Sequence, residues 1–304
     1  MKHFVMALMM SSVFCLAASA SDKPVPFKPG EAVPANIITT SHLGPFKPDM
    51  PAVLPMVVIS FQTEVTEKGG GMTSLLSTPD VIRLDGITPI LMQKITDEAQ
   101  EAIEAALIAG GWQIMPFEKI AELDVYKSWV KTPDPSVEEV KRAFFSAGKG
   151  ANTLSSKELE RVFVGGHRPL VGNGMVLGGW TGSMALCKIG QAAGAKVILF
   201  RALVNFATVT ANNAGIFRSA NRSEKAESVQ ISSAEMQIYP PDASGATPAR
   251  LNTDQVVVGP GGMIKEIQKG KGATIIVADP ERYEKDTVEA IRSIAMGFVA
   301  QAKK

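Results

Sequence analysis

The chain has 304 residues, with 31 lysines and arginines against 30 aspartates and glutamates, which gives a formal net charge of +1. Proteins that act by bulk attraction to phosphate need a marked basic excess, so this class of nucleic-acid binder is excluded. The hydrophobic fraction of 45% excludes a disordered chain, and the length suffices for one large or two ordinary domains. Two cysteines cannot build a disulfide framework.

The first twenty residues have the three parts of a secretory signal peptide. Lys2 gives a short basic end, an apolar run begins at Phe4, and Ala18-Ser19-Ala20 has the pattern of a cleavage site. The run is shorter than the ~20 residues that cross a bilayer, so cleavage after Ala20 is expected rather than a permanent anchor. Lipidation of Cys15 is disfavoured, because small residues do not precede it.

We therefore expect residues 1–20 to be removed on export to the periplasm, with or without later association with the outer membrane. The mature chain has no other segment of membrane-spanning length. Cleavage takes away Lys2 and Cys15, so basic and acidic residues balance and Cys187 remains as the single thiol. Cys187 lies in a short apolar helical stretch, which favours a buried structural thiol over a reactive one.

Residues 21–55 are rich in proline and predict an extended arm, because proline fixes φ and removes backbone donors. A four-residue repeat, Pro-Phe-Lys-Pro, begins at Pro26 and again at Pro45. Two interpretations are open. The arm is either a spacer or a segment that lies on a partner or a neighbouring subunit, with Phe27 and Phe46 as its anchors.

The remaining chain, residues 56–304, has the pattern of an α/β domain. The apolar run 56–61 is typical of a strand buried on both faces, and residues 64–86 are expected to be a loop. Thr88-Pro89 predicts the start of a long amphipathic helix that Gly110-Gly111 ends, followed by a strand at 112–117.

Residues 119–182 predict a helical and glycine-rich insertion. Helices are expected at 136–145 and 155–164, and a glycine-rich loop that contains His167 and Trp180 follows them. A helix is expected around Cys187, and Gly194 is expected to end it.

The C-terminal part of the chain predicts strands and one helix. Expected strands are 197–204, the alternating segment 229–238, an antiparallel return at 251–258, and 273–277. Asp279-Pro280 predicts the start of the last helix. The predicted fold is thus α/β (α+β), with a mixed sheet of about five strands and a long antiparallel hairpin, flanked by helices and preceded by the arm.

The common catalytic constellations are missing from the sequence, so no catalytic, cofactor-binding or metal-ligating residues are predicted. His42 and His167 stand alone, without the H-E-x-x-H or cysteine spacing of a metal site. The nucleophile elbow and the Walker sequence are also missing. An uncatalogued periplasmic enzyme remains an alternative.

A second alternative is nucleic-acid binding through residues 258–277. Gly259-Pro260-Gly261-Gly262 and the apolar strand after it resemble the core of a KH domain, in which a G-x-x-G loop joins two helices. The spacing to Ile264 is one residue short, and the chain has no basic excess. The competing interpretation is a glycine turn, and no nucleic-acid partner is expected.

The order of elements from Val57 onward resembles another family. Val57–Phe61, the helix end at Gly110-Gly111-Trp112, Gly194–Phe200 and the hairpin 229–258 stand in the order found in the periplasmic α/β domain of the curli secretion channel CsgG. Penicillin-binding-protein activator lipoproteins and the N-terminal domain of TolB share this type of domain. Residues 205–228 depart from the channel, because their charged residues do not suit membrane strands.

The resemblance implies a non-enzymatic envelope protein that assembles with a secretion, pilus, flagellar or cell-wall machine, as a homo-oligomer and in some cases a ring. We expect partner contacts through the arm, at Phe27 and Phe46, and through the glycine-rich loop, at His167 and Trp180. These long segments support themselves poorly, and each carries aromatic or apolar anchors that are expected to order on a partner.

Overall fold

The computed structural model describes residues 24–42, 50–67, 80–129, 140–141, 154–155, 161–164, 180–206, 228–241, 248–270 and 273–303. At its centre lies β3 (Ala52–Phe61), whose ten residues are all buried. β3 pairs in parallel with β9 (Lys196–Asn205), and β9 pairs antiparallel with β10 (Gln230–Tyr239). The predicted strand buried on both faces is therefore confirmed.

The main sheet around these three strands is mixed, as predicted, and larger than expected. Its strand order is β1-β12-β10-β9-β3-β8-β6, with β11 pairing to β10 and β2 pairing to β11. The other strands of this sheet are β1 (Val25–Pro26), β2 (Ile38–Ser41), β6 (Val140–Lys141), β8 (Arg161–Val164), β11 (Ala249–Thr253) and β12 (Val257–Val258), of which the last two fall in or next to the expected strand 251–258. β11 returns antiparallel along β10, which confirms the long hairpin.

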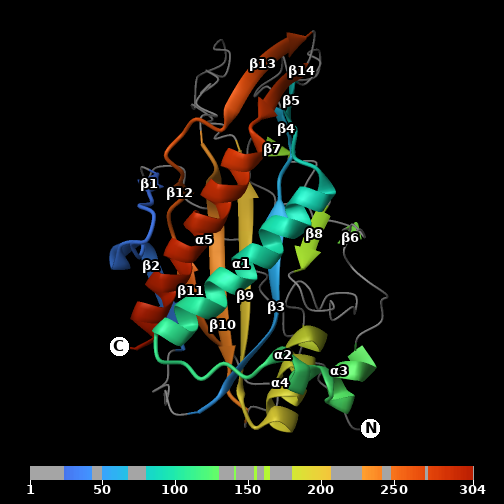
Figure 1. Ribbon diagram of the computed structural model, residues 1–304, viewed down its shortest axis with the longest axis vertical. Helices are drawn as coiled ribbons and strands as arrows, with labels where there is room; N and C mark the ends of the chain where they lie inside the picture. Colours follow the sequence, from blue (N-terminus) through green and yellow to red (C-terminus); the bar gives the residue numbers. More distant parts are fainter. Residues whose placement is uncertain are drawn as a thin grey trace, which may run out of the picture.

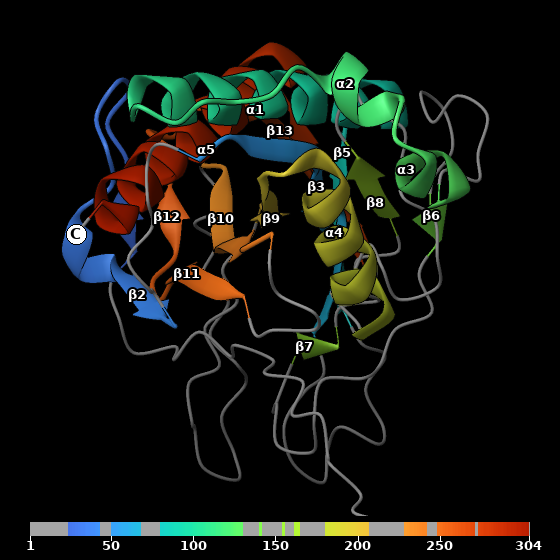
Figure 2. The same cartoon turned by 90° about the horizontal axis from the view of Figure 1, so that it is seen from below.

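Helices cover the two faces of the main sheet differently (Figures 1 and 2). α1 (Pro89–Ala109) and α5 (Pro280–Ala302) lie together across one face and bury Phe200, Ala202 and Val204 of β9 in the larger core. α4 (Trp180–Ala193) packs on the other face, where Val197 and Leu199 enter a smaller core. α2 (Phe117–Ala121) and α3 (Asp124–Trp129) complete that smaller core.

The two long helices begin where their capping residues predict. Thr88 Oγ1 accepts a hydrogen bond from the Leu91 N–H at 3.2 Å. Asp279 Oδ1 accepts from the Glu281 and Arg282 N–H groups at 3.1 and 3.2 Å. The Arg282 N–H, then Lys265, lower the pKa of the Asp279 carboxyl, because both stabilise its ionised form. Each helix has proline at its first position, which needs no donor there.

A second sheet stands at one end of the long axis (Figure 1). Its order is β13-β14-β5-β4-β7, formed by β4 (Glu64–Glu67), β5 (Asp80–Asp85), β7 (Leu154–Ser155), β13 (Ile264–Gly270) and β14 (Ala273–Ala278). The expected loop at 64–86 therefore contains two strands, because β5 pairs with the distant β14. β13 is also a strand, so the glycines at 259–262 do not join two helices as a KH loop would.

Three further expectations are corrected by pairing between distant segments. Val140–Lys141 and Arg161–Val164 lie in the two expected helices but form the strands β6 and β8. β8 pairs with β3, and β6 pairs with β8. Leu154–Ser155 overlaps the start of the second expected helix at Ser155 and pairs with β4 instead. The expected strand at 112–117 is reduced to one bridge between Ile114 and Ala52, and α2 begins after Pro116. The expected insertion thus contributes strands to both sheets.

The predicted arm, residues 21–55, ends too late, because residues 52–55 already belong to β3. Its other long described part, residues 24–42, packs on the domain itself. β1 pairs with β12 and β2 pairs with β11. Val33 is buried, and its N–H donates to the Ser293 carbonyl of α5 at 3.0 Å. Gly297 of α5 makes this approach possible, because a Cβ there would lie 2.6 Å from Val33 Cγ2. The arm is therefore not a free spacer over these residues.

Replacing Gly297 should loosen the arm. Gly297→Val places side-chain atoms where Val33 and Ile38 now lie, and such overpacking costs about 1–3 kcal/mol of unfolding free energy. Limited proteolysis should then cut residues 24–42 faster than in the wild type. Lys285→Val, at an exposed position of α5, controls for the helix propensity of valine. Equal cleavage in all three proteins would contradict the packing described.

Because the hydroxyl of Tyr283 on α5 is buried, we expect the unfolding free energy of the protein to fall at alkaline pH. The hydroxyl is fully buried and has no hydrogen-bond partner within the described part of the chain, and burial raises its pKa far above the usual range. Above pH ~10 the tyrosine ionises in the unfolded chain and stays protonated in the folded one. Its contribution to the unfolding free energy therefore falls by up to ~1.4 kcal/mol per pH unit.

Chemical unfolding between pH 8 and 11 measures this contribution. Tyr283→Phe should remove it, so that the unfolding free energy of the variant falls less steeply with pH than that of the wild type. Parallel curves would show that Tyr283 ionises equally in both states.

Candidate functional site

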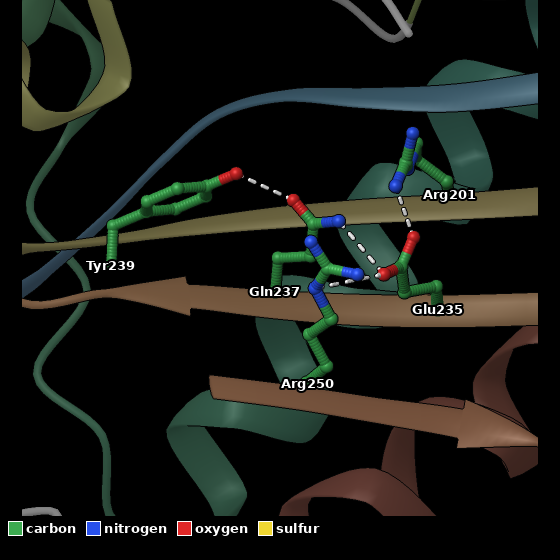
Figure 3. A network of polar contacts seen from close by, with 5 residues as sticks. All are labelled: Arg201, Glu235, Gln237, Tyr239 and Arg250. Carbon is green, nitrogen blue, oxygen red and sulfur yellow. Dashed lines mark hydrogen bonds and ion pairs between the residues drawn. The ribbon is translucent and has the colours of Figure 1, made fainter. Parts of the chain in front are cut away.

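A polar network occupies the face of the main sheet that carries α4, beside the smaller core (Figure 3). In the strand register Arg201 of β9 stands opposite Glu235 of β10, and Gln237 of β10 stands opposite Arg250 of β11. Residues opposite each other in a sheet share a face, so these four side chains meet there. Tyr239 comes two residues after Gln237 and joins them from the smaller core.

The carboxylate of Glu235 is the acceptor at the centre of this network. One of its oxygens accepts a hydrogen bond from Arg201 Nη2, and the other accepts from Gln237 Nε2 at 2.7 Å. Its side chain is 18% exposed and that of Arg201 is 25% exposed. The two donors hold the carboxylate in one orientation, partly removed from water, where charge-assisted hydrogen bonds are strong.

Gln237 connects this ion pair to the buried part of the sheet. The Tyr239 hydroxyl donates to Gln237 Oε1 at 2.6 Å, and both residues are buried. The Gln237 amide therefore uses its oxygen toward Tyr239 and its nitrogen toward Glu235. This chain of contacts fixes the position of the carboxylate from the protein interior outward.

Arg250 is the less satisfied member of the network. Its Nε lies 3.8 Å from Glu235 Oε1, which is close enough for an ion pair and too long for a hydrogen bond. Nε is buried and has no hydrogen-bond acceptor among the described residues, whereas the side chain as a whole is 40% exposed. Two guanidinium groups thus share one carboxylate, and the network carries one excess positive charge.

The contacts of Glu235 restrain its carboxylate. Each oxygen accepts one hydrogen bond, from Arg201 or from Gln237, and both contacts hold the group in place. Within the described ranges, no three side chains of His, Cys, Asp or Glu come together as metal ligands would. On its solvent side the network presents the partly exposed guanidinium of Arg250, which is paired with Glu235.

Of the four residues predicted as partner contacts, Phe27 and Trp180 belong to described segments. Phe27 is 5% exposed and packs in the larger core beside Gly259, so the structure places it inside the domain rather than on a protruding arm. Phe46 and His167 fall outside the described residues. Trp180 is the first residue of α4. Cys187 of α4 is buried in the smaller core, which confirms its structural interpretation.

Sequence reasoning missed the polar network, although a signal was present. The alternation in 229–238 predicts a strand with one polar face, and Glu235 and Gln237 are two of the polar positions of that segment. Arg201 interrupts an apolar strand in the same way. The sequence pattern does not reveal that these positions lie side by side, because that depends on the strand register.

No protein-family model, curated protein or solved structure matches this chain. The resemblance to the CsgG type of periplasmic domain therefore stays a prediction. Of the described helices, none combines the length and the apolar composition that a membrane crossing requires.

Removing the Tyr239 hydroxyl should destabilise the protein. Tyr239→Phe leaves the buried Gln237 oxygen without this donor, which costs about 1–2 kcal/mol of unfolding free energy at pH 7. Tyr283→Phe is the matched control, since it removes a buried hydroxyl that has no partner among the described residues and should be neutral or stabilising. Urea unfolding of both variants measures the difference. Equal effects would contradict the assigned hydrogen bond.

Proposed function

We propose that the chain is an exported protein of the cell envelope that acts by binding other proteins of a secretion, pilus, flagellar or cell-wall machine, without catalysing a reaction. The observation that carries this proposal is Arg250, whose side chain is 40% exposed beside a carboxylate that already accepts a hydrogen bond from Arg201. A guanidinium keeps its charge and presents several donors, so it suits a contact with an anionic group of a partner.

Two further observations support the same proposal. The first twenty residues have the pattern of a cleaved export signal, which directs the domain to the compartment where such machines assemble. The edge strand β2 beside the network has Thr39 and Ser41 exposed, so a partner can approach this face from that side. The neutral overall charge suits contacts that depend on matched groups rather than on bulk attraction.

Site-specific photocrosslinking in the native host tests the proposal. The full chain carries p-benzoylphenylalanine at position 39, on the exposed edge beside the network. The matched control carries it at position 101, an exposed site of α1 across the sheet. We expect a periplasmic protein that begins at Ser21 and forms discrete adducts with other proteins from position 39 only.

Two results would overturn the proposal. One is a chain that stays in the cytoplasm with residues 1–20 attached. The other is an exported chain that gives no adduct from position 39, or the same adducts from both positions.

A further inference from the structure

Arg250 is the arginine of the network that makes an ion pair with Glu235 without a hydrogen bond. The Glu235 oxygens accept hydrogen bonds from Arg201 and Gln237, and Arg250 Nε lies 3.8 Å from Oε1. A guanidinium has five N–H donors in a planar fork that matches a carboxylate with two parallel hydrogen bonds. The Nε of Arg250 is buried, so a ligand would meet the other atoms of the side chain, which is 40% exposed as a whole.

The surroundings of Arg250 narrow the class of ligand. Asn252, two residues along β11, shares its face, and the buried Asn252 Oδ1 has no hydrogen-bond partner among the described residues. On the neighbouring strand, Ser41 stands opposite Arg250 and Thr39 stands opposite Asn252, and both are exposed. The site therefore combines a cation with exposed hydroxyl groups, and it suits a ligand that has an anion and further hydrogen-bonding groups.

We propose that Arg250 anchors a binding site for a carboxylate carried by an extended polypeptide segment of a partner. The proposal rests on the protein-binding function above and names the chemistry of the partner. Alternate residues of an extended strand lie ~6.7 Å apart, which is also the spacing of Arg250 and Asn252 along β11. An acidic side chain on Arg250 thus places the next residue of that face at the position of Asn252 and the exposed Thr39 opposite it.

Binding of a fluorescein-labelled decaglutamate peptide to the mature chain, followed by fluorescence anisotropy at low ionic strength, tests this site. Arg250→Gln should weaken binding about tenfold or more, because it removes a charge-assisted, two-pronged contact. Arg250→Lys keeps the charge without the fork and should weaken binding several-fold. Lys285→Gln makes the same change in charge at an exposed position of α5, on the opposite face, and should leave binding unchanged.

Three other outcomes would contradict the proposed carboxylate site. Absence of saturable binding, or equal weakening by Arg250→Gln and Lys285→Gln, would show that Arg250 does not recognise carboxylates. Displacement of the peptide by inorganic phosphate, at an ionic strength matched with chloride, would assign the site to a free oxyanion instead. If the peptide fails to bind while position 39 still crosslinks to a partner, the carboxylate site fails and the binding function stands.

Discussion

The parallel pairing of β3 with β9 is the contact on which the other layers depend. Side chains alternate along both strands, so each strand sends apolar groups into the larger core under α1 and α5 and into the smaller core under α4. A parallel pair buried on both faces needs such covering layers, because it has no polar face to turn to water. β10, the hairpin strand β11 and the arm then add to the sheet on the β9 side.

The two faces of the sheet have different consequences for function. The α1–α5 face is apolar and closed, and the arm completes it by crossing α5 at Gly297. The α4 face is apolar only over β3 and the adjoining end of β9, and it becomes polar where Arg201, Glu235, Gln237 and Arg250 meet (Figure 3). Tyr239 of the smaller core donates a hydrogen bond to Gln237, and Gln237 donates one to Glu235. These two contacts connect the smaller core to the charged groups and hold Glu235 in position.

Local signals in the sequence predicted the features that depend on local physics. Thr88 and Asp279 predict the starts of their helices, because capping involves residues within one turn. The alternation that predicts β10 likewise depends only on the residues of that strand. β8 and β13 were not predicted, because their conformation is decided by pairing with β3 and β14. Likewise, Glu235 was visible as a polar position of a strand, while its meeting with Arg201 and Arg250 required the register of three strands.

The central claim is that Arg250 is held for recognition and is not needed for the fold, and urea unfolding of Arg250→Gln tests it most directly. Glu235 keeps its hydrogen bonds from Arg201 and Gln237 in the variant, so we predict an unfolding free energy within ~0.5–1 kcal/mol of the wild type. A loss of ~3–5 kcal/mol, the cost of breaking a buried ion pair, would contradict the claim and make Arg250 a structural residue.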